Sequence, residues 1–465
     1  MGDLQVLVQR ARELGTIVLQ SISDGKSIII VCNYDADGIC AATLLAKAIQ
    51  NKKGKVVVRV VSEANSDLLQ QLKEDNYDLH LFCDVGAGLV SETKSMLGDK
   101  FIIIDHHSTS DDELSSRNIF NPFQYGFDGG VDATTTYMAY LLASEIDHSV
   151  SENEWFTVVA SLADHQDQGE NHSLLGLNKA SLENVLNNKV ASTIDLMFYG
   201  TGTKPIYEGI ATTMYPYIVG LTGSKDACLA TLVSCGIPPK TGDSWRTLAD
   251  LTADEKKKLV DALLPYLTLS STAESALSQL IGTVYMLVKE DEHSSLHDAR
   301  EFGILLDACS RIGQAGVAVA ICMGDRDQSL REGEKLLTSY RQVLNKYVRS
   351  LLGDDERIIE YSKSILLSGD GMVDECMLSP LATILSSISR FHGRVLIVKT
   401  ATASGQFKIS ARKTLGSGEL SNLGMIFQEV SKMCNGRGGG TKYSAGAKIP
   451  ISKLETFVKQ VNSKL

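Results

Sequence analysis

The chain has 465 residues, of which 43% are hydrophobic and 22% are charged, so it is long enough for two or three packed domains of ordinary globular composition. Its net charge of -11 argues against a duplex-binding protein whose surface is covered with Lys and Arg. The acidic balance does not exclude nucleic acid, because carboxylates that hold divalent cations take their positive charge from the metal.

The nine cysteines are scattered along the chain and include no C-x-x-C pair. Such a set forms neither a disulfide framework nor a zinc knuckle, so we expect a reducing, cytoplasmic environment. No run approaches the roughly 18 apolar residues that a membrane span needs, and the first residues carry no apolar signal segment. The sequence therefore predicts a protein without a membrane partner.

The first 170 residues alternate short β-branched runs with amphipathic segments. This alternation is typical of a mostly parallel sheet with helices on both faces. The pattern predicts a helix over 39–52 and buried strands over 27–32, 55–61, 78–83 and 100–104. We place the N-terminal α/β domain at 1–190.

The middle of the chain has a mainly helical pattern that is interrupted by prolines. It predicts a helical insert over 191–290, followed by the end of the first lobe and a connecting helix over 291–353. Within the latter segment, the apolar run 316–323 predicts a strand. The charged and apolar residues of 329–352 alternate at helical spacing and predict the connecting helix.

The last part of the chain returns to a strand-rich pattern, with expected strands over 365–367, 394–398 and 406–411. It then reaches a glycine-rich stretch at 436–440, which predicts a loop. We place a smaller C-terminal α/β domain at 354–465.

Carboxylates and histidines gather at four places where the pattern predicts the carboxyl end of a strand: Asp35 with Asp37, Asp84, Asp105 with His106 and His107, and Asp164. Loops at the carboxyl ends of an open α/β sheet converge on one crevice, so we expect the four clusters to meet. Oxygen ligands with an imidazole suit Mn²⁺ or Mg²⁺, and two such ions can activate a water and stabilise a leaving phosphoryl oxygen. A single Asp after a strand is usually a turn or a helix cap, but four clusters in one structural position favour a metal site.

At these residues the sequence resembles the DHH phosphoesterase superfamily, through the motifs FCDVG at 82–86, IIDHH at 103–107 and ADHQD at 163–167. The segment 298–311 is similar to a motif of archaeal RecJ-like nucleases, and 438–446 resembles the glycine-rich loop of the DHH-associated C-terminal domain. The resemblance implies an α/β fold with a mostly parallel, doubly wound DHH domain, a helical insert, a connecting helix and a smaller C-terminal α/β substrate-binding domain.

The resemblance also implies roles for individual residues. It implies two ions, Mn²⁺ or Mg²⁺, one held by Asp35 and Asp84 and the other by Asp37, Asp84, His106 and Asp164. Asp84 would bridge the ions, Asp105 would orient its neighbours, and His107 would face the scissile phosphate. The implied substrate contacts are Arg311, Ser410, Arg412, Arg437, Gly438, Gly439, Gly440 and Lys442.

The chain departs from the family pattern at several positions. Asn33, a neutral and poorer metal ligand, stands where relatives usually have His or Asp. Thr441 stands where the glycine-rich loop commonly has His, and Asp307 and Ser310 stand where the preceding motif commonly has Asn and Gly. These departures leave open a slow enzyme, an altered substrate preference or a partly degenerate member.

The resemblance implies a metal-dependent exonuclease that hydrolyses phosphodiester bonds in single-stranded DNA or RNA, in DNA replication or repair. One alternative is a weakly active or inactive replication scaffold bound to the GINS complex, with which archaeal relatives associate. Another is a phosphodiesterase of short oligonucleotides or cyclic dinucleotides. The sequence leaves open the polarity of digestion, the choice between DNA and RNA, the physiological metal, the effect of Asn33 and Thr441 on activity, and the oligomeric state.

Overall fold

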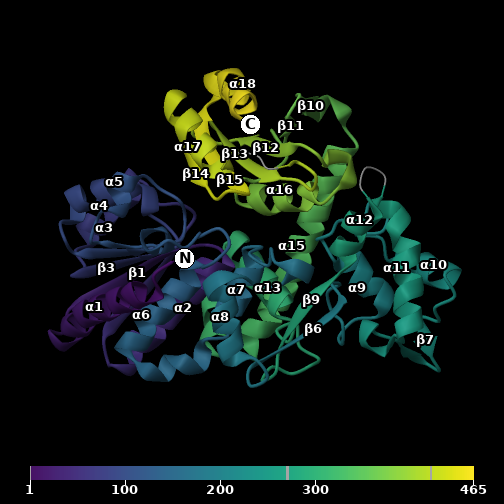
Figure 1. Cartoon of the computed structure of the whole chain (residues 1–465), viewed down its shortest axis with the longest axis horizontal. Coiled ribbons are helices and arrows are strands. Elements are labelled where there is room, and N and C mark those ends of the chain that lie inside the picture. Colours follow the sequence, from purple (N-terminus) through teal and green to yellow (C-terminus); the bar gives the residue numbers. More distant parts are fainter. Residues whose placement is uncertain (1, 269–271, 419–421) are drawn as a thin grey trace. The chain divides into compact units, whose positions relative to one another are not determined.

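The computed structural model describes residues 2–268, 272–418 and 422–465 (Figure 1). The chain forms two compact units, and each combines segments that are far apart in the sequence. The first unit consists of Met1–Ala191, Tyr285–Lys289 and Phe302–Leu337. The second consists of Ser192–Val284, Glu290–Glu301 and Thr338–Leu465. In the described part of the chain, no helix combines the length and the apolar character that crossing a bilayer would require.

The first unit contains a five-stranded sheet of order β2-β1-β3-β4-β5, in which every neighbouring pair is parallel. The predicted parallel sheet is therefore confirmed. Because β2 and β3 lie on opposite sides of β1, the winding of the sheet reverses between β1 and β3, and such a reversal opens a crevice at the carboxyl ends. The strands are β1 (Ser27–Asn33), β2 (Lys55–Val61), β3 (Leu79–Cys83), β4 (Phe101–Ile104) and β5 (Ile119–Phe120).

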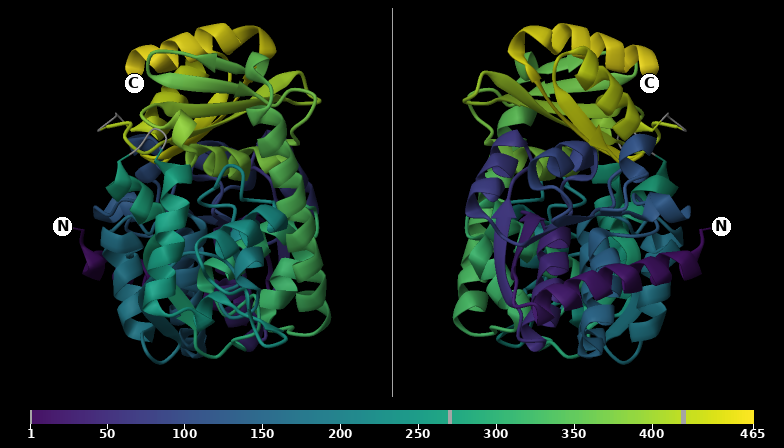
Figure 2. Two further views of the ribbon diagram at one scale, coloured as in Figure 1. Left: turned by 90° about the vertical axis from the view of Figure 1, so that its right-hand side faces the viewer. Right: turned by 90° about the vertical axis from the view of Figure 1, so that its left-hand side faces the viewer.

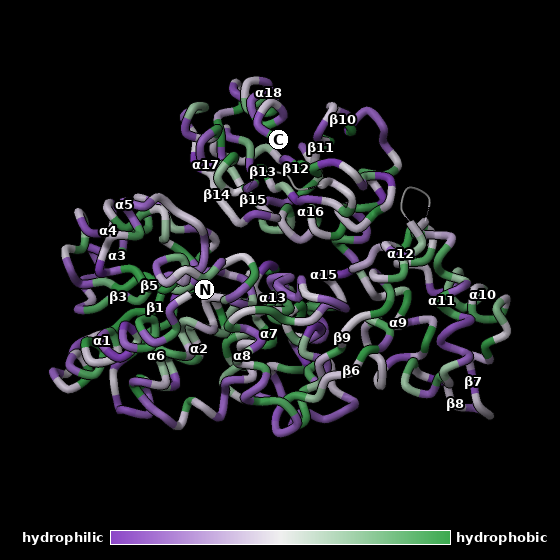
Figure 3. The backbone as a smooth tube through the Cα atoms, viewed as in Figure 1, coloured by the Kyte–Doolittle hydropathy of each residue, from purple (hydrophilic) through white to green (hydrophobic). Residues whose placement is uncertain are grey.

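Helices cover both faces of this sheet (Figure 1). On one face, Ile29 and Val31 of β1 pack with leucines and valines of α3 (Ser66–Asp75) and α4 (Val90–Leu97). On the other face, α2 (Ala36–Asn51) packs against β1. The middle of β1, from Ile28 to Cys32, is apolar and buried, and β3 is apolar apart from the buried His80; Figure 3 shows green backbone in both strands.

Further helices of the first unit surround α2. The helix α6 (Thr135–Ile146) packs against both α2 and α1 (Leu4–Ser23), and α7 (Phe156–Ala163) packs against α2 and α8 (Gly176–Val185). The short helix α5 (Asp111–Leu114) follows β4. The helices α13 (Ala299–Arg311) and α14 (Ala315–Met323) follow the insert, and α14 also packs against α2. Their contacts bury α2 almost completely.

Two expected strands are helices. The run 316–323 lies in α14, and the apolar run that precedes Asp164 lies in α7. Both segments are short, apolar and rich in valine, and periodicity does not distinguish a buried helix from a buried strand in such runs. In α14 the buried residues Ala318, Ile321 and Cys322 follow helical spacing. Asp164 therefore follows a helix and not a strand.

The helical insert of the second unit has a core of its own. It contains α9 (Ile206–Thr212), α10 (Lys225–Ser234), α11 (Ala253–Leu267), α12 (Ala273–Leu280) and the hairpin of β7 (Lys240–Thr241) and β8 (Ser244–Trp245). The chain enters the insert through β6 (Val190–Leu196) and leaves it through β9 (Ile281–Leu287), and these two strands form a two-stranded sheet. Next to them, the backbone amide of Met197 donates to the carbonyl of Leu280 over 2.9 Å.

The expected connecting helix is α15 (Gln328–Leu352). It is followed by a six-stranded sheet of order β10-β11-β12-β13-β15-β14, in which the pair β11 and β12 is parallel and the other pairs are antiparallel. The strands are β10 (Ile358–Glu360), β11 (Ser364–Ser368), β12 (Val395–Ala401), β13 (Gln406–Lys413), β14 (Arg437–Gly440) and β15 (Ser444–Pro450).

A hydrophobic core forms where α17 (Leu423–Met433) and α18 (Leu454–Lys464), yellow in Figure 2, pack against apolar residues of β13 and β15. The helix α16 (Leu378–Ser386) contacts β12 and β13. The glycine-rich stretch, expected as a loop, is the edge strand β14. Its glycines let α17 approach closely, because a Cβ at Gly438 would collide with Ser431 and Phe427 of that helix. Close packing of backbone on backbone is the physical reason why a glycine run forms a strand here.

Candidate metal centre

The first two carboxylates lie where the chain passes from β1 into α2, Asp35 at the N-cap and Asp37 in the first turn of the helix. Asp35 caps α2, because its side chain accepts the backbone amide of Gly38 over 3.1 Å. Gly38 is required there, since a Cβ would lie 2.6 Å from the carbonyl oxygen of Asn33. Asp37 is completely buried, and its two oxygens accept the backbone amides of Thr135 and Thr136 over 2.8 and 2.7 Å. The start of α6 thus fixes this carboxylate and stabilises its charge.

Asp84 directly follows β3, and its carboxylate lies between the side chains of Asn33 and His106. It is 3% exposed, and its backbone adopts a positive φ of 61°, which is uncommon for a residue other than glycine. Its Oδ1 accepts the hydroxyl of Thr135 over 3.0 Å, and its Oδ2 accepts the side-chain amide of Asn33 over 2.9 Å. Burial, followed by the charge of Asp35, raises the pKa of Asp84 well above its ordinary value. Such strain and such a shift are common at functional sites.

His106 connects three of the carboxylates. Its Nδ1 donates to the carbonyl of Gly129 over 2.5 Å, so Nε2 is the nitrogen that faces the acidic groups. Nε2 lies 3.3 Å from Asp84 Oδ1, 3.3 Å from Asp164 Oδ2 and 3.9 Å from Asp37 Oδ2. Burial alone would lower the pKa of His106, but the hydrogen bond to Asp84 and the three negative charges raise it well above its ordinary value. A backbone acceptor behind Nδ1 is the usual arrangement of a metal-binding imidazole.

Asp105 orients the second histidine. It is 1% exposed, and its Oδ2 accepts the backbone amide of Ala87 over 2.9 Å. Its Oδ1 accepts both the backbone amide and Nδ1 of His107, over 3.1 and 2.8 Å. Burial would raise the pKa of Asp105, but the charge of His107 and its hydrogen bonds lower it. The side chain of His107 is 38% exposed, so it is held in one orientation while it stays accessible.

Within the part of the chain that the structure describes, two groups of ligand atoms have the spacing of a cation site. One is formed by Asp37, His106 and Asp164, the other by Asp84, His106 and His107, and within each group the atoms lie within 4.8 Å of one another. Carboxylate oxygens with an imidazole fit Mn²⁺ or Mg²⁺. The structure thus brings Asp35, Asp37, Asp84, His106 and Asp164 together, with Asp105 and His107 beside them.

Sequence models of three protein families match the chain: the DHH family N-terminal domain over residues 27–164, the DHH-CID domain over 198–281 and the DHHA1 domain over 367–465. The chain belongs to the DHH superfamily. The resemblance stated from its motifs is confirmed.

Two related proteins illustrate the match in sequence. An uncharacterized protein of Methanocaldococcus jannaschii is 25% identical over 446 residues, covering 94% of this chain and 92% of the relative. The single-stranded-DNA-specific exonuclease RecJ of Bacillus subtilis is 25% identical over 189 residues, which cover 38% of this chain and 24% of RecJ. The matched segment thus covers only about a quarter of that exonuclease.

Solved structures share the DHH protein's fold. RecJ from Thermus thermophilus in complex with Mn²⁺ superimposes with a TM-score of 0.57 at 17% identity, over 98% of this chain and 54% of RecJ. CDC45 from Entamoeba histolytica superimposes with a TM-score of 0.62 at 14% identity, over 98% of both chains. The DHH protein therefore spans about half of the Thermus RecJ and nearly all of CDC45.

Arg311 supports the first loop of the DHH domain from α13. Its side chain is 7% exposed, its Nε donates to Asp307 over 3.3 Å, and its guanidinium lies over the ring of Tyr34 at 4.7 Å. Asp307 also accepts the backbone amide of Ala36 over 2.8 Å. The two side chains thereby connect α13 to the loop that carries Asp35 and Asp37.

The other expected substrate contacts belong to the second unit, in the DHHA1 domain. Arg412 on β13 donates to Thr383 and Ser379 of α16, over 2.9 and 2.7 Å, and to the hydroxyl of Ser410 over 3.2 Å. A Cβ at Gly439 would meet no atom within 4 Å, so the fold itself does not require glycine there. The remaining residues of this set lie on β14 or directly after it: Arg437, Gly438, Gly440 and Lys442.

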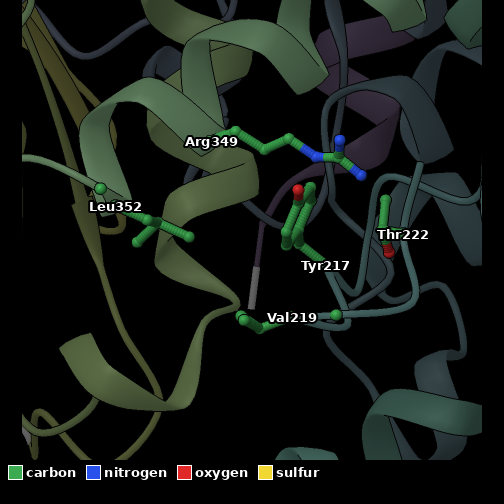
Figure 4. A pocket seen from close by; sticks show the side chains of 7 residues that line it. Tyr217, Val219, Thr222, Arg349 and Leu352 are labelled. Carbon is green, nitrogen blue, oxygen red and sulfur yellow. The ribbon is translucent and has the colours of Figure 1, made fainter. Parts of the chain in front are cut away.

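A pocket of about 380 Å³ also lies in the second unit, where the DHH-CID insert meets the end of α15 (Figure 4). The hydroxyl of Tyr217 donates to Asn345 over 2.8 Å, and Figure 4 shows the guanidinium of Arg349 close to this ring. None of the described residues that line the pocket offers a carboxylate or an imidazole to a metal ion. The lining residues are Tyr217, Val219, Gly220, Thr222, Arg349, Leu352 and Gly353.

Several residues of the centre were not recognised from the sequence. Thr135 and Thr136 bind Asp37 and Asp84, and Gln166 donates to the carbonyl of Gly129 over 3.0 Å, behind His106. A Cβ at Gly129 would overlap the carbonyl oxygen of His106. The threonine run at the start of α6 is a helix-start signal, which predicts the cap but not the carboxylates that the first turn binds.

Proposed function

We propose that this DHH-superfamily protein is a metal-dependent phosphodiesterase that degrades single-stranded DNA or RNA from an end, in DNA replication or repair. The observation that carries the proposal is the orientation of His106, whose Nδ1 donates to a carbonyl while Nε2 lies 3.3 Å from oxygens of Asp84 and Asp164. The Bacillus relative is a single-stranded-DNA-specific exonuclease, which supports the substrate class.

The residues of the centre divide the chemical work. Asp37, Asp84, His106 and Asp164 would hold Mn²⁺ or Mg²⁺, which supplies a Lewis acid and lowers the pKa of a bound water. The exposed His107, oriented by Asp105, would donate a hydrogen bond to the scissile phosphate. In the DHHA1 domain, Arg412, Arg437 and Lys442 and the glycines of β14 would contact the nucleic-acid backbone.

The test is the degradation of end-labelled single-stranded DNA and RNA of defined polarity by purified protein with Mn²⁺. The wild type should shorten one or both substrates, and EDTA should stop it. Asp84→Ala and His106→Ala should each lower the rate at least about 100-fold, because each removes a ligand. Asp67→Ala, which removes an exposed carboxylate from α3 in the same unit, is the matched control and should keep the wild-type rate. No shortening by the wild type, or equal shortening by Asp84→Ala, would rule out the proposal.

A second candidate is a replication scaffold that binds GINS and has little or no catalysis. The neutral Asn33 at the metal centre favours it, and the fold shared with CDC45 is compatible with it. Co-purification with GINS and no metal-dependent turnover would support this role. A ladder of oligomers tests the remaining alternative, since an enzyme for short oligonucleotides should cleave dimers to pentamers faster than long strands.

A further inference from the structure

The side-chain amide of Asn33 lies between two carboxylates of the centre. Its Nδ2 donates to Asp35 Oδ2 over 2.5 Å and to Asp84 Oδ2 over 2.9 Å. Its Oδ1 accepts the backbone amide of Tyr34 over 3.0 Å. These three bonds fix the orientation of the amide, because a flipped group would turn its oxygen toward two carboxylates and lose the bond from Tyr34. Asn33 therefore presents hydrogen atoms, and no lone pair, to Asp35 and Asp84.

The two oxygens of Asp84 face different surroundings. Oδ1 lies 3.3 Å from His106 Nε2 and 3.7 Å from His107 Nδ1. Oδ2 accepts the amide of Asn33, whose other acceptor is Asp35. A carboxylate can bridge two ions with one oxygen on each. The place beside Oδ2, where a cation would join Asp84 to Asp35, thus already holds a hydrogen-bond donor.

The two imidazoles, of His106 and His107, lie beside the other oxygen of Asp84, Oδ1. Among the described residues, both groups of carboxylate and imidazole atoms with cation spacing contain His106, and neither contains Asp35. An amide nitrogen has no lone pair available for a metal, and the amide oxygen of Asn33 is turned away from the two carboxylates, toward the backbone amide of Tyr34. The ligands therefore fit one ion beside Asp84 Oδ1 and do not fit a second ion beside Oδ2.

We infer that this protein binds a single divalent ion, held by Asp37, Asp84, His106 and Asp164, and that the amide of Asn33 replaces the second ion between Asp35 and Asp84. The partial positive charge of the two amide hydrogens offsets the repulsion of these carboxylates, as a cation would. The inference rests on the metal binding of the proposed function and specifies its stoichiometry. It differs from the two ions that the family resemblance implies.

The experiment is a count of bound Mn²⁺ by equilibrium dialysis, together with electron paramagnetic resonance of the same samples. The wild type should bind one ion per chain and give the spectrum of an isolated Mn²⁺. Asn33→Asp replaces the amide by a carboxylate and should bind two ions, whose spectrum shows spin coupling between neighbouring ions. Asn188→Asp adds the same charge at an exposed position of the first unit and should still bind one ion.

Three outcomes would overturn the inference. Two coupled ions in the wild type would refute it and leave the proposed function intact. A single ion in folded Asn33→Asp would show that another feature limits the stoichiometry. No ion in the wild type would refute both the inference and the metal dependence of the function. Circular dichroism checks that Asn33→Asp is folded, and the wild-type count decides the question without that variant.

Discussion

Binding of a divalent ion should displace a proton from His106. Nδ1 of this imidazole donates to Gly129, and Nε2 faces Asp37, Asp84 and Asp164, whose charges raise the pKa of His106 well above 6.5 in the metal-free protein. The stability that this proton contributes is fully present below the ordinary pKa and is lost as the pH rises through the raised pKa. A metal ion binds through the same lone pair of Nε2 and must displace this proton. At a pH above the raised pKa the proton is already lost, so metal binding no longer has to displace it.

The size of the effect follows from proton linkage. In the window above 6.5, each pH unit should lower the free energy of unfolding of the metal-free protein by about 1.4 kcal/mol per displaced proton. The affinity for Mn²⁺ should rise about tenfold per pH unit in this window. The increase in melting temperature that Mn²⁺ causes should therefore grow by roughly 3–6 °C per pH unit.

Calorimetric melting of EDTA-treated and Mn²⁺-loaded protein, at pH values from about 6.5 to about 8.5, measures this dependence. In His106→Gln the growth of the Mn²⁺ stabilisation with pH should disappear. His148→Gln removes an exposed imidazole from the same unit and should behave as the wild type. A stabilisation by Mn²⁺ that is the same at every pH would refute the assignment of the displaced proton to His106.

Three further changes test the packing around the two units. Gly129→Ala should lower the free energy of unfolding by roughly 1–3 kcal/mol in urea titration, because the new methyl overlaps a carbonyl of the metal centre, while Gly88→Ala, whose methyl meets no atom, should have little effect. Arg246→Ala should cost roughly 1 kcal/mol at neutral pH. The hydrogen bonds from Arg246 lower the pKa of Glu255 from 4.5 to about 2. The stability that they contribute is present above pH 4.5 and is lost as the pH falls toward 2, so the free energy lost in Arg246→Ala should shrink over that range. Glu301→Gln should cost about 3–5 kcal/mol, since this buried carboxylate pairs with two cationic side chains, and an equal melting curve would contradict the pairing.

The parts of the fold that followed from the sequence are those with unambiguous local patterns. The strands β1 and β4 contain continuous apolar runs, and β3 is apolar apart from His80. All three are buried on both faces, and α15 has a long charged and apolar alternation. The helices α7 and α14 were expected as strands, because a short run of valine and alanine fits either structure when it is fully buried. Tertiary contacts, chiefly with α2, decide such segments.

The acidic cluster was predictable for a similar reason. Asp35, Asp84 and His106 follow strands of a parallel sheet, whose carboxyl ends share one edge. The contacts of Thr135 with Asp37 and Asp84 were not predictable, because these residues are 98 and 51 positions away in the sequence and the contacts depend on how α6 packs on α2. The donor role of Asn33 depends on the direction of one amide, which residue type alone does not specify.

The two ends of the insert lie next to each other in space, because Met197 at its start and Leu280 at its end share a backbone hydrogen bond. A segment with adjacent ends and a core of its own behaves as a module. The entropy cost of closing it as a loop grows only logarithmically with its length, and its apolar side chains are buried against one another. Evolution can therefore lengthen, shorten or exchange this module without disturbing the strands at its base. A permuted protein whose new termini lie inside the insert should likewise retain the fold on both sides of it.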